Sequence, residues 1–300
     1  MCLENRLRAY ADVECNVSFK KRTTFRIGGN CAYYVYPKNY LCLIRIMEIL
    51  KSEQISWKLF GKGSNLLCSD DDYDGVVISL DRYFTDFYFE EDGCCIAEAG
   101  CSIILLAHEA MNVSLSGLEF ASGIPGTLGG ALFMNAGAYK SNMAEIVKEV
   151  YVLINQEVKK LSIDSLEYGY RSSIFQKNRD WIILGAKIQL TKGNQKDIRT
   201  LMDSRRERRM SSQPLSMPNA GSVFRNPEGH AAWQLIEEAG LRGLTIGGAQ
   251  VSDKHANFIV NADNASAKDV AELMGIIQKT VKERFQVELK SEVEKFNWKQ

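Results

Sequence analysis

Residues Glu119–Gly137 read EFASGIPGTLGGALFMNAG, and this stretch constrains the fold more than any other. Its nineteen residues include five glycines among small alanine, serine and threonine side chains. Because glycine loses more backbone entropy on folding than any other residue, a cluster this dense indicates a backbone that must approach another group closely. Two partners fit that requirement: a phosphate bound by backbone N–H groups at a helix N-terminus, or a neighbouring segment packed tightly against a turn.

A second glycine turn, G-K-G-S-N, lies upstream at 61–65 and follows an apolar run over 55–60 that predicts a buried strand. A strand that ends in such a turn offers an anion its backbone N–H groups, the Ser64 hydroxyl and the Asn65 amide, although a plain hairpin turn has the same composition. Neither loop matches the Walker A or the Rossmann pattern. The two loops together favour a dinucleotide diphosphate held between two lobes.

The composition is that of an ordinary soluble globular protein. The chain has 300 residues, of which 45% are hydrophobic and 25% charged, and its formal net charge is zero. A neutral chain produces no overall field that would attract nucleic acid or an acidic membrane. No apolar stretch approaches the roughly 20 residues needed to span a bilayer, and the N-terminus lacks the apolar core of a signal peptide. We therefore expect a cytoplasmic protein without nucleic-acid or membrane partners.

The cysteines and histidines do not form a recognisable metal site. All eight cysteines lie within the first 101 residues, and none belongs to a C-x-x-C pair. The three histidines, His108, His230 and His255, are scattered along the chain and lie at no metal-ligand spacing from the cysteines. We expect free, buried thiols in a reducing compartment and no bound metal.

Hydrophobic periodicity and turn residues divide the chain into three expected domains. Residues 1–82 are expected to form an α/β lobe that ends shortly after the first glycine loop. Residues 83–200 form a second lobe, which contains the glycine-rich stretch. Residues 201–300 form a C-terminal domain. The two glycine loops therefore come from different lobes of the expected fold.

Several elements are predicted by the pattern alone. Residues 1–22 are expected to be helical or irregular, and residues 84–99 to form a hairpin. Apolar residues recur at helical spacing after Ser266, a suitable N-cap, which predicts the longest helix over 266–285. A polar helix is expected over 197–210, where a run of arginines faces either phosphates or solvent.

Three polar clusters outside the glycine loops could carry chemistry. In Y-G-Y-R-S-S-I-F, Arg171 suits recognition of an anion or a polarised carbonyl, or it is a surface arginine on an edge strand. In P-N-A-G-S-V-F-R-N-P, small residues flank Ser222; because no G-x-S-x-G elbow is present, Ser222 is either an exposed hydroxyl other than a hydrolase nucleophile or a structural serine turn. In L-K-S-E-V, Glu292 is either a functional carboxylate or a solvated charge.

Taken together, these motifs resemble those of the UDP-N-acetylenolpyruvoylglucosamine reductases, the MurB flavoenzymes of peptidoglycan precursor synthesis. The shared motifs run in the family's order along almost the whole chain: T-F-R-I-G-G, G-K-G-S-N-L-L, G-I-P-G-T-L-G-G-A, N-A-G-A-Y, Y-G-Y-R-x-S-x-F, A-G-S-V-F-R-N-P, V-S-D-K-H-A-N-F-I-V-N and L-K-S-E-V. The resemblance implies an α+β protein: a two-lobed FAD-binding fold of the p-cresol methylhydroxylase type, followed by a C-terminal α+β substrate domain.

The resemblance also implies an activity and three catalytic residues. A member of this family is an NADPH-dependent reductase with noncovalent FAD, which converts UDP-N-acetylglucosamine-enolpyruvate to UDP-N-acetylmuramate and so serves cell-wall synthesis, cell shape and division. Hydride would pass from N5 of reduced FAD to the enolpyruvyl group. Arg171 matches the family's catalytic arginine, which stabilises the developing charge. Ser222 matches the proton donor, and Glu292 matches the acidic partner. We expect a monomer.

The same resemblance implies two sets of binding residues, one for FAD and one for the substrate. The FAD diphosphate is expected to contact both glycine loops, at Gly61, Gly63, Ser64, Asn65, Ser122, Gly123, Gly126 and Thr127. The sugar-nucleotide substrate is expected to contact Tyr170, Arg225, Asn226 and His255.

The chain departs from the family's pattern in a few places. Glu292-Val293 is followed by Glu294 and Lys295, where the family commonly has an arginine directly after the valine. Asn257 stands where glycine is common. The short segment after Arg171 leaves no room for an extra substrate-covering loop, so the chain resembles the shorter branch of the family.

Two other functions stay open at this point. One is a different FAD oxidoreductase of the same fold, such as an oxidase with covalently attached flavin, although neither glycine loop contains the histidine or cysteine used for attachment. The other is a non-catalytic nucleotide-binding relative, which the presence of Arg171, Ser222 and Glu292 disfavours.

Overall fold

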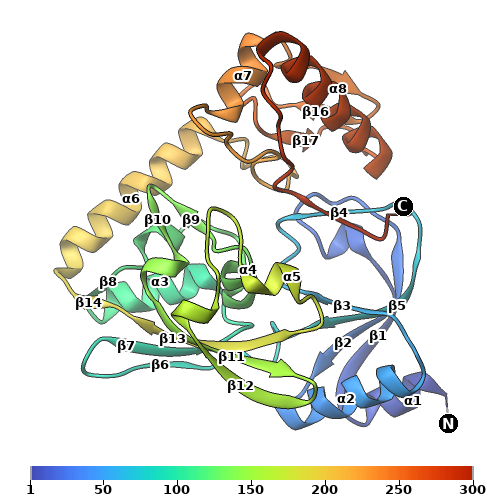
Figure 1. The fold of residues 1–300 in the computed structure, drawn as a ribbon, viewed down its shortest axis with the longest axis vertical. Helices are drawn as coiled ribbons and strands as arrows, with labels where there is room; N and C mark the ends of the chain where they lie inside the picture. Colours follow the sequence, from blue (N-terminus) through green and yellow to red (C-terminus); the bar gives the residue numbers. More distant parts are fainter. Residues whose placement is uncertain (1, 299–300) are drawn as a thin grey trace. The chain divides into compact units, whose positions relative to one another are not determined.

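The computed structural model describes residues 2–298, which form two compact units built from separate segments of the chain (Figure 1). The first unit holds the residues through Cys15, Tyr33–Lys62 and Gly75–Glu207, and the second holds Asn16–Ala32, Gly63–Asp74 and the chain from Arg208 onward. This grouping differs from the sequence-based division at residues 82 and 200, because two N-terminal segments pack with the C-terminal part of the chain. The three-domain division stays a prediction.

A four-stranded sheet with two helices is formed by the N-terminal part of the chain, mostly within the first unit. The strand order is β1-β2-β5-β3, and β3 runs parallel to β5. The elements are α1 (Leu3–Arg8), β1 (Ala11–Ser18), the 3₁₀ turn Phe19–Lys21, β2 (Asn30–Pro37), α2 (Tyr40–Ser52), β3 (Trp57–Phe60) and β5 (Tyr73–Ser79). The prediction of a helical or irregular segment over 1–22 is wrong for β1, in which the alternate residues Ala11, Val13 and Val17 are buried.

A five-stranded antiparallel sheet of order β12-β11-β13-β7-β6 forms the rest of this unit. Its strands are β6 (Phe87–Phe89), β7 (Cys94–Glu98), β11 (Val147–Ile154), β12 (Glu157–Ser162) and β13 (Ile182–Gln189). The predicted hairpin over 84–99 is confirmed as β6 and β7. Helix α4, which follows the glycine-rich loop, packs against β7 and β13 (Figure 1).

Short elements connect these strands. They are α3 (Ile103–Asn112), β8 (Leu115–Ser116), α4 (Leu128–Phe133), β9 (Gly137–Ala138), β10 (Ser141–Asn142), α5 (Ile174–Lys177), β14 (Thr191–Lys192) and the 3₁₀ turns Glu119–Ala121, Met143–Glu145 and Ile163–Ser165. Strand β8 pairs with β14, and β9 pairs with β10, both in antiparallel fashion.

The second unit combines two small sheets with two helices. A three-stranded antiparallel sheet has the order β15-β16-β17, and β18 runs parallel to β4. The elements are β4 (Leu66–Cys68), α7 (Ala232–Glu238), β15 (Thr245–Ile246), β16 (Ala249–Val251), β17 (Ile259–Asn261), α8 (Ala267–Phe285) and β18 (Glu294–Phe296).

Each unit has its own hydrophobic core. In the second unit α8 supplies much of that core, and the predicted helix is confirmed. The Ser266 hydroxyl accepts the Asp269 N–H at 3.0 Å, and the Asp269 carboxylate accepts the Ser266 N–H at 2.9 Å, which together form a capping box. The face predicted from the spacing is buried: Val270, Leu273, Ile277 and Val281.

Helix α6 (Gln195–Ser212) begins in the first unit and ends in the second. Only Ile198 and Met202 are buried on it, and most of its arginines are exposed. This exposure favours a solvated helix over a phosphate-binding one. Within residues 2–298, no helix is both long enough and apolar enough to cross a lipid bilayer.

Candidate active site

The two glycine loops meet at Gly61 and Thr127. A Cβ atom added to Gly61, directly after β3, would lie 2.7 Å from the Thr127 hydroxyl oxygen, so only glycine fits there. Thr127 is the N-cap of α4, and its hydroxyl accepts the Gly130 N–H at 3.2 Å. Because accepting that bond leaves the hydroxyl proton available, Thr127 retains a donor beside the backbone of the first loop. A hydroxyl donor beside a glycine turn is chemically suited to a diphosphate oxygen.

The N-terminus of α4 itself is occupied by protein acceptors. The Leu128 N–H donates to the Cys101 carbonyl and the Gly129 N–H to the Ala99 carbonyl, each at 2.8 Å. A Cβ on Gly129 would lie 3.1 Å from the Ala99 Cβ, so this glycine allows the helix to pack closely on β7 and the residues after it. Close packing therefore accounts for Gly129, and an anion would have to be bound by the loop before the helix.

That preceding loop holds three of the expected FAD contacts, Ser122, Gly123 and Gly126. The Ser122 hydroxyl donates to the Glu119 carbonyl at 2.9 Å, within its own turn. The Gly126 N–H donates to the Ile124 carbonyl at 2.8 Å. These bonds hold the loop in shape but occupy the Ser122 hydroxyl and the Gly126 N–H as donors. Gly123 lies in the turn between them.

The remaining contacts expected for FAD, Gly63, Ser64 and Asn65, belong to the second unit. Gly63 is buried with φ +61°, and a Cβ on it would lie 2.2 Å from the Arg22 carbonyl oxygen. Ser64 is half-buried in the turn that follows. The Asn65 amide donates to the Glu292 carbonyl at 3.0 Å, and the Asn65 carbonyl accepts the Glu294 N–H at 3.0 Å. One amide hydrogen of Asn65 is therefore used to hold the Glu292 segment.

Substitution of Gly61 should weaken flavin binding without unfolding the protein. We expect Gly61→Val to lower FAD affinity by about tenfold or more, because its side chain would force the loop away from Thr127, a clash typically worth 1–3 kcal/mol. Titration of the deflavinated variant with FAD, followed by flavin fluorescence, measures the change. Gly275→Val is a control, since nothing lies within 4 Å of a Cβ at that helical position. Equal FAD affinity in Gly61→Val and the parent protein would contradict the expectation.

Arg171 occupies a strained turn in the first unit. Gly169 and Ser172 exchange backbone hydrogen bonds of 3.2 Å, and Arg171 between them has φ +54°, in the left-handed region that non-glycine residues rarely adopt. Its guanidinium donates to the Gly137 carbonyl at 2.8 Å and lies 5.2 Å from the centre of the Tyr170 ring. Such strain persists only where the surroundings enforce it, and it is concentrated at functional sites.

A buried asparagine enforces this turn. The Asn135 amide donates to the Gly169 carbonyl at 2.9 Å, and its carbonyl oxygen accepts the Ala144 N–H at 2.9 Å. On the other side of the turn, the Gln176 amide donates to the Arg171 carbonyl at 3.0 Å. The Arg171 backbone is thus fixed from both sides before any ligand binds.

Ser222 and Glu292 lie on neighbouring segments of the second unit. The Glu292 N–H donates to the Val223 carbonyl at 2.8 Å, and Phe224 forms a β-bridge with Ser291. Both Ser222 and Glu292 are half-buried. After Glu292 the chain enters β18, which pairs with β4, so the altered residues Glu294 and Lys295 belong to a strand that anchors the Glu292 segment. Arg171 belongs to the first unit.

The four expected substrate contacts differ in how firmly they are held. Tyr170 is 55% exposed. Asn226 accepts the Ala232 N–H through its side-chain oxygen at 3.0 Å and so caps α7, while the Nε atom of Arg225 is buried without a partner among the described residues. His255 is half-buried beside the Phe258 ring, at 4.9 Å between centroids, and burial lowers its pKa. A neutral ring agrees with Nδ1 accepting the Asn257 N–H at 3.2 Å.

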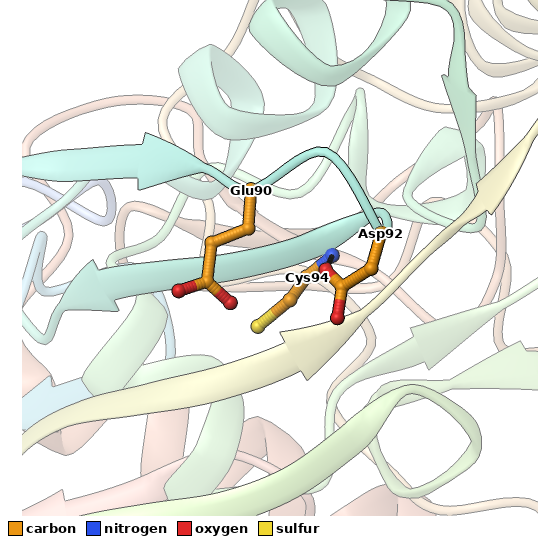
Figure 2. Close-up of side chains that lie close together, drawn as sticks. All are labelled: Glu90, Asp92 and Cys94. Carbon is orange, nitrogen blue, oxygen red and sulfur yellow. Dashed lines mark hydrogen bonds between the residues drawn. The ribbon is translucent and has the colours of Figure 1, made fainter.

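Figure 2 shows one group with the composition of a metal site, Glu90, Asp92 and Cys94 at the turn of the β6–β7 hairpin. Their ligand atoms lie within 4.8 Å of one another. The Asp92 carboxylate accepts the Cys94 N–H at 2.9 Å, and burial raises the pKa of the Cys94 thiol. A protonated thiol is a poor ligand, and exposed acidic groups at a turn are common, so we assign no metal to this cluster.

All eight cysteines are free thiols, but they are not all buried. The expected burial is confirmed for Cys31, Cys68, Cys94, Cys95 and Cys101. It is wrong for Cys2 and Cys15, which are exposed. Burial raises the pKa of Cys95 and Cys101 to about 12 and also raises that of Cys68. These buried thiols are therefore protonated and inert near neutral pH.

Comparison with known proteins identifies the family. The FAD-binding domain model matches residues 31–157, and the model of the UDP-N-acetylenolpyruvoylglucosamine reductase C-terminal domain matches residues 213–296. The UDP-N-acetylenolpyruvoylglucosamine reductase of Anoxybacillus flavithermus is 43% identical over 94% of this chain and 93% of its own length. That of Bacillus subtilis is 39% identical over 96% of this chain and 95% of its own length.

The chain belongs to the UDP-N-acetylenolpyruvoylglucosamine reductase family.

A solved structure agrees with this assignment. The crystal structure of UDP-N-acetylenolpyruvylglucosamine reductase from Thermus caldophilus has a TM-score of 0.81 and 32% identity, and the match covers 96% of this chain and 100% of that chain. The expected α+β fold with an FAD-binding part and a C-terminal domain is thereby confirmed, as is FAD as the cofactor. All eight residues expected to contact FAD fall within the matched FAD-binding domain, at residues 31–157.

The C-terminal domain of this reductase family, residues 213–296, includes most of the remaining candidates: Ser222, Arg225, Asn226, His255 and Glu292. Tyr170 and Arg171 lie between the two matched domains. The individual site assignments stay predictions.

Sequence reasoning left Asn135, Asn219 and Asn257 without a function, although each holds a turn that carries a candidate residue of the reductase. Asn219, for example, accepts the Gly221 N–H at 2.9 Å, next to Ser222. A usable signal was present at Asn257, which interrupts the apolar run Ala256–Val260. An amide in a run that is expected to be buried must find hydrogen-bond partners, and backbone groups are the commonest ones.

Proposed function

We propose that this chain reduces the enolpyruvyl ether of UDP-N-acetylglucosamine-enolpyruvate to UDP-N-acetylmuramate, with NADPH as the reductant, in peptidoglycan precursor synthesis. The observation that carries the proposal is the relationship over 94% of the chain to proteins of that name. The adjacency of the Ser222 and Glu292 segments, joined by the bond from the Glu292 N–H to the Val223 carbonyl, supports a common site for these two residues.

FAD, when bound, would carry two electrons from NADPH to the substrate. The chain's contribution to holding it would come from the Gly61 loop and the Thr127 hydroxyl, whose oxygen would lie 2.7 Å from a Cβ on Gly61. A hydroxyl and closely approaching backbone are suitable for a diphosphate, which needs neutral donors near its oxygens. No histidine or cysteine occurs in either loop, which supports noncovalent binding.

Arg171 would stabilise the negative charge that develops beside the substrate carboxylate. Its guanidinium is always protonated and is tethered by the Gly137 carbonyl at 2.8 Å, so little reorganisation is needed when charge appears. A preorganised donor of this kind lowers the barrier by about 3 kcal/mol in comparable enzymes. Tyr170, over whose ring the guanidinium lies, would contact the substrate.

Ser222 would give its hydroxyl proton to the α-carbon of the substrate. A hydroxyl is a weak acid, but an enolate carbon is a strong base, so a positioned Ser–OH suffices as the donor. Glu292 would bind the carboxylate end of the substrate when it carries a proton, or hold a water molecule or an arginine when it does not. Arg225, Asn226 and His255 would contact the sugar nucleotide.

We place the enzyme in the cytoplasm as a monomer without nucleic-acid or membrane partners. The formal net charge of zero and the free thiols support this setting.

The absorbance spectrum of the purified protein tests the proposed function. We expect a flavin band that bleaches on addition of NADPH and returns when UDP-N-acetylglucosamine-enolpyruvate is added without oxygen. Acid precipitation should leave the yellow colour in the supernatant. Failure of the substrate to restore the band in NADPH-reduced protein would contradict the proposed activity, and colour retained in the pellet would contradict noncovalent FAD.

A further inference from the structure

Asn257 places a buried amide directly behind the Ser222 turn. Its exposed fraction is 4%, and its side chain binds both backbone groups of Phe224. The Phe224 N–H donates to the Asn257 side-chain oxygen at 3.0 Å, and the Asn257 amide donates to the Phe224 carbonyl at 2.8 Å. The backbone adds a third bond, from the Val223 N–H to the Asn257 carbonyl at 2.9 Å.

This arrangement needs both halves of an amide. One oxygen accepts from an N–H and one nitrogen donates to a carbonyl of the same residue, so no aliphatic or hydroxyl side chain satisfies both groups. Loss of the amide would leave two backbone groups of Phe224 buried without partners, and buried backbone groups are almost always paired. Asn257 therefore fixes the backbone position of Phe224.

The fixed residue lies two positions from Ser222, and on the other side of Ser222 the chain is held at Asn219, whose carbonyl accepts the Thr24 hydroxyl at 2.7 Å. Gly221 has φ +78°, and a Cβ on it would meet nothing within 4 Å. The Gly221 N–H bonds only locally, to the Asn219 side chain. The Ser222 turn is therefore held on both sides, and on the C-terminal side Asn257 binds both residues that follow the serine, Val223 and Phe224.

We propose that Asn257 is a positioning residue for the reaction: it holds the Ser222 hydroxyl where the proton can be transferred to the substrate. The inference rests on the proposed function of Ser222. The backbone of Asn257 also contacts a second candidate, because its N–H donates to His255 Nδ1 at 3.2 Å.

Two matched aspartate substitutions separate positioning from simple packing. Asn257→Asp keeps the side-chain acceptor for the Phe224 N–H but loses the donor to the Phe224 carbonyl. Asn261→Asp is the control, because that side chain also accepts from one backbone N–H (Ala265, 2.8 Å) and donates to backbone carbonyls (Phe25, 3.2 Å, and Arg26, 3.4 Å), away from Ser222. Stopped-flow absorbance follows flavin reduction by NADPH and, separately, flavin reoxidation by the enolpyruvyl substrate.

We expect Asn257→Asp to slow reoxidation by about 10²-fold at high pH, since a displacement near 1 Å can cost that much, and to leave reduction by NADPH unchanged. The defect should shrink as the pH falls, because a protonated carboxyl can again donate to the Phe224 carbonyl. Asn261→Asp should change neither half-reaction. Combined with Ser222→Ala, Asn257→Asp should add no further slowing, because both changes act through one hydroxyl.

A measurement that needs no turnover completes the test. Hydrogen–deuterium exchange of the peptide 219–226 should be faster in Asn257→Asp and unchanged in Asn261→Asp. If Asn257→Asp does not fold, Asn257→Ser replaces it, since one hydroxyl cannot satisfy both backbone groups of Phe224; faster exchange and slowed reoxidation are expected of it too.

The outcomes distinguish the two hypotheses. Unchanged reoxidation in Asn257→Asp across pH 5 to 9, or equal slowing by Asn257→Asp and Asn261→Asp, overturns the positioning proposal while leaving the proposed function intact. If Ser222→Ala alone leaves reoxidation unchanged, the assigned function of Ser222 fails, and the positioning proposal fails with it.

Discussion

Replacement of Ser222 by alanine is expected to slow flavin reoxidation by the enolpyruvyl substrate by about 10²- to 10⁴-fold. Reduction of the flavin by NADPH should keep its rate, because no proton from Ser222 is needed in that half-reaction. The hydroxyl lies on a turn whose backbone is already held by the bond between Val223 and Glu292, so removing one oxygen should not disturb the fold. Stopped-flow absorbance at the flavin band measures the two half-reactions separately.

Ser211→Ala provides the control for this experiment, because that hydroxyl lies on the exposed helix α6 and donates to the Arg208 carbonyl of its own turn. It should change neither half-reaction. An equal loss in both half-reactions of Ser222→Ala would refute the proton-donor assignment, since it would indicate a general defect in flavin binding or folding.

Replacement of Arg171 by alanine is expected to slow reoxidation by about 10²- to 10³-fold, the usual cost of removing one preorganised donor from a developing charge. Arg171→Lys should recover only part of the loss. Lysine keeps the charge, but its ammonium cannot present the planar guanidinium that is tethered to the Gly137 carbonyl. The comparison of reoxidation rates at saturating substrate gives the size of the effect.

Arg179→Ala is the matched control, because Arg179 is an exposed arginine that follows α5 and lies over the Phe133 ring. We expect its removal to leave reoxidation unchanged. If Arg171→Ala raised only the KM for the substrate and left the maximal rate intact, Arg171 would be a binding residue and the assignment to charge stabilisation would be wrong.

Elements with a strong local signal were predictable from the sequence. Helix α8 is one, because Ser266, Asp269 and the spacing of its apolar residues all act within the same segment. The β6–β7 hairpin is another. Strand β1 was missed, although Asp12, Glu14 and Asn16 alternate with apolar residues in the pattern of a half-buried strand, so the sequence did carry its signal.

The pairing of strands distant in sequence could not be predicted from local sequence patterns. Strand β18 pairs with β4 across more than two hundred residues, and no local period records which distant strand completes a sheet. The same limit applies to the candidate site. Motifs named Arg171, Ser222 and Glu292, but the amides of Asn135, Asn257 and Asn65 that hold their segments act on backbone groups distant in sequence. Every residue has a backbone carbonyl, so the sequence does not indicate which one a side-chain amide will bind. These contacts can be identified only in the folded structure.

Because some cysteines are exposed and others are buried, thiol labelling can follow the unfolding of this protein. Alkylation requires an accessible sulfur, so a maleimide should label the exposed Cys2 and Cys15 before the buried cysteines. Cys95 lies in the first compact unit and Cys68 in the second. Mass spectrometry of the labelled peptides at increasing denaturant concentration would therefore show when each unit unfolds, without an engineered probe.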